Sequence, residues 1–262
     1  ARIPQEVTWY RIAAIVWAIL ILPWTARPAG FELHALDVGH GTAVTLRSPG
    51  GAVWVFDAGS RDRPGVDREA LGPWLRAFET PRVGVVLSHA HRDHDGALPW
   101  LVERFPPTVW AGALPAHLAA RLPHTVPRLE LALGRGLLPD LDRGATGLQL
   151  EISRAVDDPG NEGSLVLEVL WREARIVLCG DADEEGLAIW LRQRPPRGPA
   201  RLLLLPHHGS DTEHLGRLLA RVRPSEVWIS ATGTPALQPE LERRGLAWKS
   251  TSIHGSLELE LP

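Results

Sequence analysis

Four side chains that can bind a metal ion lie close together near the middle of the first half of the chain. They are His89, His91, Asp93 and His94, in the segment Ser88-His89-Ala90-His91-Arg92-Asp93-His94. The segment follows an apolar run and precedes a predicted helix from about residue 95 to 105, so it falls on a turn that can direct several side chains to one point. Imidazole and carboxylate are ligands that zinc, manganese and iron accept, and burying four such groups without a cation is costly. The spacing therefore predicts a metal centre.

Two later turns carry the same residue types directly after apolar runs. Asp181 follows the run ARIVLCG at 174–180, and His207 and His208 follow RLLLLP at 201–206, in the segment LPHHGS. A Gly-Asp pair after a strand is, on its own, more often an ordinary turn, and a histidine pair in a turn is metal-binding about as often as not. All three turns together predict one site at which strand ends converge, with Asp181 able to bridge two ions.

The elements that position these turns are mostly strands. Runs at 31–38, 42–48 and 52–59 predict a meander, and later runs predict strands at 82–88, 147–153, 164–171, 174–180, 201–206, 226–231, 246–250 and 256–261. Helices are predicted at about 67–79, 95–105, 183–194 and 214–222. Because strands dominate both halves and helices lie between them, we expect an α+β fold with two sheets packed face to face and helices outside.

An apolar run, IAAIVWAILILPW at 12–24, precedes this region, with Trp9, Tyr10 and Arg11 before it. A helix needs about 20 residues to cross a bilayer, so the run is too short to span one alone. It fits the end of a transmembrane helix, an uncleaved signal peptide or a buried helix. We favour the first interpretation and divide the chain into an apolar segment, 1–29, and a catalytic domain, 30–262.

Composition excludes some kinds of site. Cys179 is the single cysteine, which excludes an intramolecular disulfide framework and a Cys-rich zinc site. The formal net charge of -3 provides no overall field that would attract nucleic acid. Any contact with DNA would therefore need a local arginine patch.

The chain resembles the metallo-β-lactamase superfamily and, within it, the C-terminal domain of ComEC-type DNA-internalisation proteins of bacterial competence. The resemblance covers about residues 30–262. Besides the three turns, it rests on the blocks LDVGHG at 36–41, FDAG at 56–59 and NEGSLVL at 161–167. It implies an αββα sandwich in which loops at one edge of the two sheets hold two divalent metal ions, Zn²⁺ or Mn²⁺.

The resemblance also implies a role for each candidate residue. One ion is expected on His89 and His91, the other on Asp93 and His94, with Asp181 bridging the two and either His207 or His208 completing the second site. Asp93, His91 and Asp181 are expected to take part in catalysis. Four residues are expected to orient the ligands by hydrogen bonds: Asp37, Asn161, Ser164 and Ser210.

This sequence departs from the family pattern at three places. The superfamily commonly supplies a further histidine near Asn161 to Ser164, and this chain has none there, so we expect a ligand-poor first site. Many ComEC-type proteins carry Asp where His91 stands. Their later Gly-His-Pro segment is replaced here by Leu237-Gln238-Pro239.

The function implied is metal-dependent hydrolysis. We favour a nuclease or phosphodiesterase that acts on DNA, with single strands the expected form, during DNA uptake. The expected setting is the bacterial cytoplasmic membrane, reached through the N-terminal segment and other parts of a membrane DNA-transport protein, with the domain on the outer face. Two alternatives stay open: a hydrolase of a small ester, lactone or phosphoester, and a non-catalytic DNA-binding domain with a reduced metal site.

Overall fold

The computed structural model describes residues 30–78, 82–142 and 147–262. The apolar segment 1–29, which we interpreted as the end of a transmembrane helix, lies outside the described residues. Among the helices within the described ranges, none is both long and apolar enough to cross a membrane.

The first sheet has seven strands within the described residues, in the order β14-β1-β2-β3-β4-β5-β6. They are β1 (Phe31–Ala35), β2 (Ala43–Arg47), β3 (Val53–Ala58), β4 (Val83–Leu87), β5 (Val109–Gly112), β6 (Arg128–Leu129) and β14 (Leu257–Leu261). From β14 to β3 the neighbours are antiparallel, which confirms the meander expected at 31–59. From β3 to β6 they are parallel.

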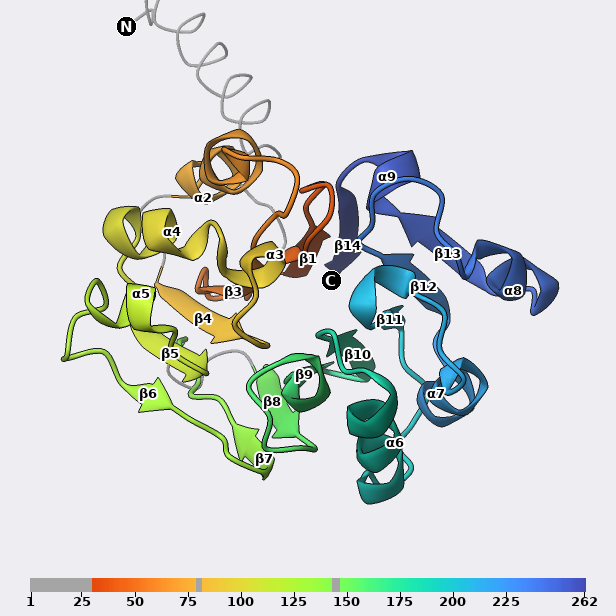
Figure 1. The fold of residues 1–262 in the computed structure, drawn as a ribbon. Coiled ribbons are helices and arrows are strands. Elements are labelled where there is room, and N and C mark those ends of the chain that lie inside the picture. Colours follow the sequence, from red (N-terminus) through yellow and green to blue (C-terminus); the bar gives the residue numbers. More distant parts are fainter. Residues whose placement is uncertain (1–29, 79–81, 143–146) are drawn as a thin grey trace, which may run out of the picture.

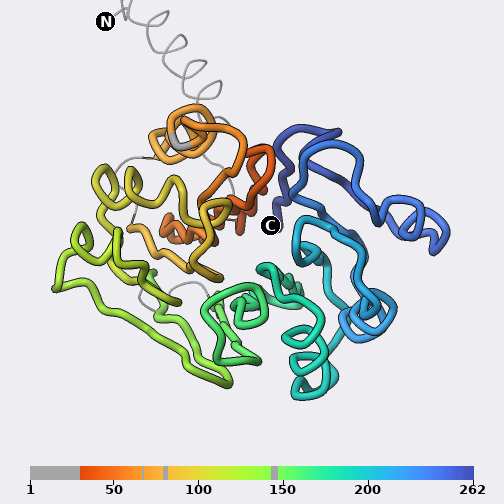
Figure 2. Tube along the Cα trace, viewed as in Figure 1, coloured from red at the N-terminus to blue at the C-terminus, as the bar shows by residue number. Residues whose placement is uncertain are grey.

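The second described sheet repeats this plan, with seven strands in the order β13-β12-β11-β10-β9-β8-β7. They are β7 (Gly134–Leu137), β8 (Gln149–Arg154), β9 (Val166–Trp171), β10 (Ala174–Cys179), β11 (Leu202–Leu204), β12 (Glu226–Ile229) and β13 (Ala247–Ser250). Strands β7 to β10 are antiparallel and β10 to β13 are parallel. The chain completes the second sheet before its last strand, β14, returns to pair with β1 in the first (Figure 2).

The two sheets pack face to face around a buried core that includes Phe56 and Trp54 from the first and Leu167 and Trp228 from the second. Helices cover the outer faces, α2, α4 and α5 on the first sheet and α6, α7 and α8 on the second (Figure 1). Strands β4 and β11 are continuous apolar runs because both of their faces are covered. This arrangement confirms the expected αββα sandwich.

The helices differ from the sequence expectation mainly where proline interrupts them. The helix expected at 95–105 is two helices, α3 (Arg92–Asp95) and α4 (Leu98–Arg104), with Pro99 in the first turn of α4, where its missing N–H costs least. The helix expected at 67–79 is a π-helical turn, η1 (Asp67–Leu71), followed by α2 (Gly72–Arg76). The remaining helical elements are α5 (Ala116–Ala119), η2 (Asn161–Gly163), α6 (Glu184–Gln193), η3 (His207–Gly209), α7 (Leu215–Val222), α8 (Gln238–Arg243) and α9 (Thr251–His254).

Candidate metal centre

The three turns singled out in the sequence meet where the carboxyl ends of parallel strands from both sheets come together. The first turn follows β4, the second follows β10, and the third, η3, follows β11. Backbone hydrogen bonds connect the sheets at this edge, because Leu165 N donates to Ser88 O (3.0 Å) and Gly180 N donates to Leu165 O (3.3 Å). A Cβ atom at Gly59 would lie 2.4 Å from the carbonyl carbon of Asp93. Glycine at this position therefore lets the strand β3 turn pack directly against the ligand loop.

One cluster contains Asp93, His94, Asp181 and His208, whose ligand atoms all lie within 4.8 Å of one another. Asp181 Oδ2 is 3.0 Å from His94 Nε2 and 3.5 Å from His208 Nε2, and Asp93 Oδ2 is 3.7 Å from His208 Nε2. Both histidine Nε2 atoms are buried, yet within the described part of the chain neither forms a hydrogen bond. Two unsatisfied ring nitrogens facing two carboxylates are a donor set that suits a borderline divalent cation. These four residues fit a metal ion.

The structure separates the two histidines that the sequence left as alternatives. His208 Nδ1 lies 3.0 Å from the carbonyl oxygen of Ser230, so its Nε2 faces the cluster. His207 instead places Nδ1 3.5 Å from Asp183 and lies outside the cluster. Both histidines have left-handed backbone, with φ of 49° at His207 and 55° at His208, a conformation that costs roughly 1–2 kcal/mol for an L-residue. The surrounding fold therefore holds a strained turn that directs His208, not His207, inward.

His94 lies between two buried carboxylates. Its Nδ1 is 2.7 Å from Asp57 Oδ2, and its Nε2 faces Asp181. Burial alone would lower the pKa of His94, but the charges of Asp181 and Asp57 outweigh burial and raise it well above its usual value. Burial would likewise raise the pKa of Asp181, but the neighbouring charge of His94 holds it below its usual range. The opposite shifts of these pKa values follow from the position of His94 between the two carboxylates.

Asp57 is the site residue that the sequence did not identify. It is fully buried, and it accepts hydrogen bonds from the Ser88 N–H and from the Ser88 hydroxyl, each at 2.7 Å, besides its contact with His94. The hydrogen bonds to the ligand loop that we expected from Asp37 therefore come from Asp57. Asp37 accepts from Gly39 N (3.2 Å) and pairs with Arg63 (3.2 Å). The available signal was the block FDAG, which places Asp57 at the end of a strand.

His89 and His91 lie beside the cluster without joining it. His89 Nε2 is 3.0 Å from His91 Nδ1, and the ring of His89 is 4.2 Å from that of His94, measured between ring centroids. Burial, together with the neighbouring charge of His94, lowers the pKa of His89 to about 3, which keeps its ring neutral and able to ligate. His91 is exposed. Among the described residues, the first site thus offers two imidazoles that lie outside the four-residue cluster.

The other residues expected to orient ligands differ in their surroundings. Ser164 connects the two parts of the site, because its hydroxyl lies 3.1 Å from His89 Nδ1 and accepts a hydrogen bond from Asp181 N (3.1 Å). Asn161 begins η2, and its Oδ1 is buried with no hydrogen bond to the described residues. Ser210 is exposed just after η3. His40, half-exposed, lies at the rim with Nε2 3.7 Å from Asp93 Oδ2.

Comparison with known proteins agrees with this geometry. Residues 36–233 match the family model described as the metallo-beta-lactamase superfamily. The chain is 30% identical over 207 residues to protein YcaI of Escherichia coli, covering 79% of this chain and 26% of that protein. It is 26% identical over 261 residues to competence protein ComA of Neisseria gonorrhoeae, covering 94% of this chain and 35% of that protein. The chain thus spans about a quarter to a third of these relatives.

Solved structures support the fold. Igni18, a metallo hydrolase from Ignicoccus hospitalis, superposes with a TM-score of 0.55 at 16% identity, covering 88% of this chain and 100% of the other. Together, the family match over most of the domain, the αββα sandwich and the strand-end cluster of histidines and carboxylates lead to one conclusion. The chain belongs to the metallo-β-lactamase superfamily and is a hydrolase of that family.

Proposed function

We propose that this domain is a dinuclear metal-dependent phosphodiesterase that cleaves DNA, within a longer protein of bacterial DNA uptake. The observation that carries the proposal is the cluster of Asp93, His94, Asp181 and His208, in which two buried Nε2 atoms have no hydrogen bond and face two carboxylates. A divalent cation bound there, Zn²⁺ or Mn²⁺, would supply Lewis acidity toward a phosphoryl oxygen and make water acidic enough to be a nucleophile near neutral pH. A second ion would use His89 and His91.

The residues of the chain divide the remaining work. Asp93 has a side chain 16% exposed, so it can reach a water molecule from the rim of the site. Burial would raise the pKa of Asp93, but the neighbouring ring of His208, whose Nε2 is 3.7 Å away, and the charge of His94 keep it below its usual range. The carboxylate is therefore ionised at neutral pH and can accept a proton from an attacking water. Asp57 and Ser164 hold His94, His89 and the Asp181 loop in fixed orientations.

Similarity to competence protein ComA supports DNA as the substrate and DNA uptake as the process. Because the chain spans only 35% of that protein, the rest of the longer protein would supply the DNA-transport parts and the membrane attachment. The apolar segment at 12–24 supports attachment to the bacterial cytoplasmic membrane. We propose that the domain lies on the outer face, where it would meet incoming DNA, including single strands.

One observation favours a second candidate, a DNA-binding domain with reduced turnover. His89 and His91 are placed to hydrogen bond to each other (3.0 Å), and among the described residues neither belongs to the cluster that contains the carboxylates. A site with so few ligands would bind its ion weakly. The cluster of Asp93, His94, Asp181 and His208 would then bind one metal ion without completing a dinuclear catalyst.

The test uses the full 262-residue chain loaded with Mn²⁺ or Zn²⁺. Labelled single- and double-stranded DNA is assayed beside bis(p-nitrophenyl) phosphate, a lactam and a lactone. We expect metal-dependent cleavage of DNA that falls at least about 100-fold in Asp93→Asn. Asp157→Asn is the matched control, since Asp157 is exposed and lies outside the cluster, and it should leave cleavage unchanged.

The other outcomes each contradict part of the proposal. Turnover of the lactam or lactone alone would contradict a phosphodiesterase. Binding of metal and DNA without any turnover would favour the second candidate. Cleavage that survives in Asp93→Asn would show that the activity does not come from this cluster.

A further inference from the structure

A pocket of about 520 Å³ lies on the outside of the second sheet, between the loop after α6 and the end of α7. It is lined by Pro196, Arg197, Arg217, Ala220, Arg221 and Arg223. Four of these six residues are arginines, and none is acidic. Figure 1 shows α6 and α7, whose carboxyl-terminal ends border the pocket, among the helices outside the second sheet.

The positive charge is concentrated in two segments, 192–201 and 215–223, which contain no Asp or Glu. Their arginines are Arg192, Arg194, Arg197, Arg201, Arg217, Arg221 and Arg223. Carboxylates compensate three of them, since Arg194 and Arg197 pair with Glu151 and Glu168, and Arg201 pairs with Glu226. Across the described residues, the other four have no ion pair. The chain as a whole is acidic, so this surface is a local exception.

The fold orients two of these guanidinium groups. Arg221 Nη1 donates to the carbonyl oxygen of Arg194 (2.7 Å), and Arg223 Nη2 donates to that of Arg197 (3.0 Å). Each guanidinium carries five N–H donors, so most of them stay free. The leucines of α7 pack inward, while Arg217 and Arg223 are exposed. Arginines near the carboxyl end of a helix also stabilise the helix by offsetting its negative partial charge. This explanation does not apply to Arg217, which lies in the first turn of α7, at the amino end.

The metal centre lies at the opposite ends of the same two helices. Asp183 is the residue before α6, two residues after Asp181, and His214 is the residue before α7, six residues after His208. The two starts are close, because His214 Nε2 lies 3.6 Å from Glu184 Oε2. At 1.5 Å per residue, α7 extends about 12 Å and α6 about 15 Å. Each strand of a DNA duplex carries one phosphate per about 3.4 Å of helix axis, so either helix spans roughly four nucleotides of a duplex.

We propose that this arginine pocket binds the phosphates of a nucleic-acid strand, several nucleotides away from the phosphate that reaches the metal centre. The arrival of another phosphate of the same strand at the metal centre rests on the proposed function. Arginine is suited to the role, because its planar guanidinium bonds phosphate oxygens in pairs and cannot lose its charge. The pocket supplies the local arginine patch that an acidic chain needs if it is to contact DNA.

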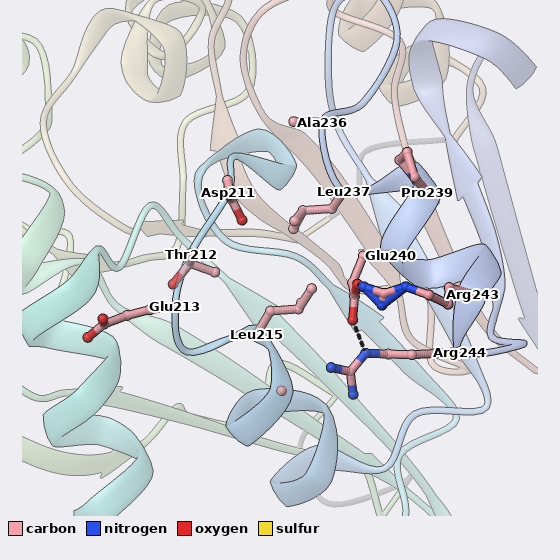
Figure 3. Close-up of a pocket in the computed structure, with 11 residues that line it drawn as sticks. Asp211, Thr212, Glu213, Leu215, Ala236, Leu237, Pro239, Glu240, Arg243 and Arg244 are labelled. Carbon is pink, nitrogen blue, oxygen red and sulfur yellow. Dashed lines mark hydrogen bonds and ion pairs between the residues drawn. The ribbon is translucent and has the colours of Figure 1, made fainter.

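A neighbouring pocket shows why the arginine pocket is the better candidate. That pocket, of about 500 Å³, lies between the loop before α7 and α8 (Figure 3). Its two arginines, Arg243 and Arg244, both pair with Glu240, and Asp211 and Glu213 also line it. Its charge is therefore compensated and slightly negative, which disfavours a polyanion.

The test compares Arg217→Gln/Arg223→Gln with the matched control Arg76→Gln/Arg104→Gln. The control residues are exposed on α2 and α4, over the other sheet, and have no ion pair within the described residues. Binding of a fluorescein-labelled 20-nucleotide single strand is measured by anisotropy from 50 to 300 mM KCl. The protein is the metal-loaded full chain, with Asp93→Asn in every form to block turnover.

Each phosphate contact on a single strand contributes about 0.7 to the slope of log K against log [salt], which is about 5-fold in affinity at 0.1 M salt. We therefore expect the pocket variant to bind about 25-fold more weakly at 0.1 M, with a slope smaller by about 1.4, and the control to match the parent. Without Asp93→Asn, kcat/KM should fall for the oligonucleotide but not for bis(p-nitrophenyl) phosphate, which is too small to reach the pocket.

Failure of this inference is distinguishable from failure of the proposed function. If no form cleaves DNA, the binding measurement still decides whether the pocket holds phosphates. Equal affinities and salt slopes in the pocket variant and the parent would overturn the inference, as would an equal loss in the control. Vesicles containing phosphatidylglycerol provide the last arm, since loss of vesicle binding with unchanged DNA binding would make the pocket a lipid site.

Discussion

Replacing Asp57 by Asn tests whether the buried hydrogen bond to His94 determines metal affinity. Asn keeps the shape of the side chain and its oxygen acceptor but removes the charge. Asp57 has left-handed backbone, with φ of 55°, and Asn adopts this conformation as readily as Asp. The substitution therefore changes the contact with His94 Nδ1, 2.7 Å away, without adding backbone strain.

The magnitude follows from the kind of hydrogen bond that is lost. A hydrogen bond to a charged group contributes about 1.5–3 kcal/mol and a neutral one about 0.5–1.5 kcal/mol. The midpoints of these ranges differ by about 1.3 kcal/mol, close to the ~1.4 kcal/mol that corresponds to tenfold in an equilibrium constant. This lies at the lower end of the range usual for groups that orient metal ligands. We expect Asp57→Asn to bind Zn²⁺ about ten times more weakly than the parent chain.

The assay is competition for Zn²⁺ against a fluorescent chelator, with circular dichroism to verify folding. Asp37→Asn is the control, because Asp37 lies at the surface and contacts Arg63 and Gly39, and its affinity should stay within about twofold of the parent. If Asp37→Asn weakened binding and Asp57→Asn did not, the role that the sequence suggested for Asp37 would be right. The hydrogen bond to His94 would then not control the site.

Four further outcomes follow from the structure. His208→Ala should lower Zn²⁺ affinity at least about tenfold, whereas His207→Ala should not. The same chelator assay measures both affinities, and equal losses in the two variants would contradict the assignment of His208. Glu168→Gln should lower the free energy of unfolding by about 3–5 kcal/mol in urea, since it removes the carboxylate charge that pairs with buried Arg175 and half of the pairing of buried Arg194, which keeps Glu151. Burial would raise the pKa of Glu151, but hydrogen bonds from Arg194 and Arg197 hold it below its usual 4.5. The contribution of Glu151 to the free energy of unfolding should therefore be complete above pH 4.5 and fall as the pH decreases further. The parent and Glu151→Gln should then converge in stability in acid. Saturating Zn²⁺, at about 100 times its Kd, should stabilise the fold by about 2.7 kcal/mol relative to the chelated protein, visible as a higher melting temperature, and an equal shift in Asp181→Asn would contradict binding at the cluster.

The candidate ligands could be predicted from the sequence because each follows a strand that is a continuous apolar run. Such runs mark strands buried on both faces, and the turn after a parallel strand lies at the edge where loops gather. That reasoning identified Asp93, His94 and Asp181. It could not choose between His207 and His208, because contacts with other parts of the fold distinguish them: His208 Nδ1 lies beside the Ser230 carbonyl oxygen, and His207 Nδ1 lies beside Asp183.

Asp57 could not be identified as a site residue from the sequence, because its role depends on the order of strands in the sheet. Asp37 and Asp57 both lie near the end of a strand and close to glycine, so their local patterns are alike. Strand β3 pairs in parallel with β4, which places the end of β3 beside the start of the ligand loop. Strand β1 is separated from β4 by β2 and β3. Only long-range pairing distinguishes the two aspartates, and the arginine pocket similarly joins segments about twenty residues apart.

The division of ligands between the sheets explains why the two halves of the site differ. Asp93 and His94 come from the first sheet, and Asp181 and His208 come from the second, so a cation at the cluster would connect the two layers. His89 and His91 follow a strand of the first sheet, and within the described residues the second sheet places the Ser164 hydroxyl 3.1 Å from His89 Nδ1. Packing of the sheets can therefore preorganise the cluster before any ion binds, whereas the first site gains no charged ligand from that packing. On this reasoning we expect the cluster to bind its ion before, and more tightly than, a second site on His89 and His91, and we expect turnover to depend on occupancy of that second site.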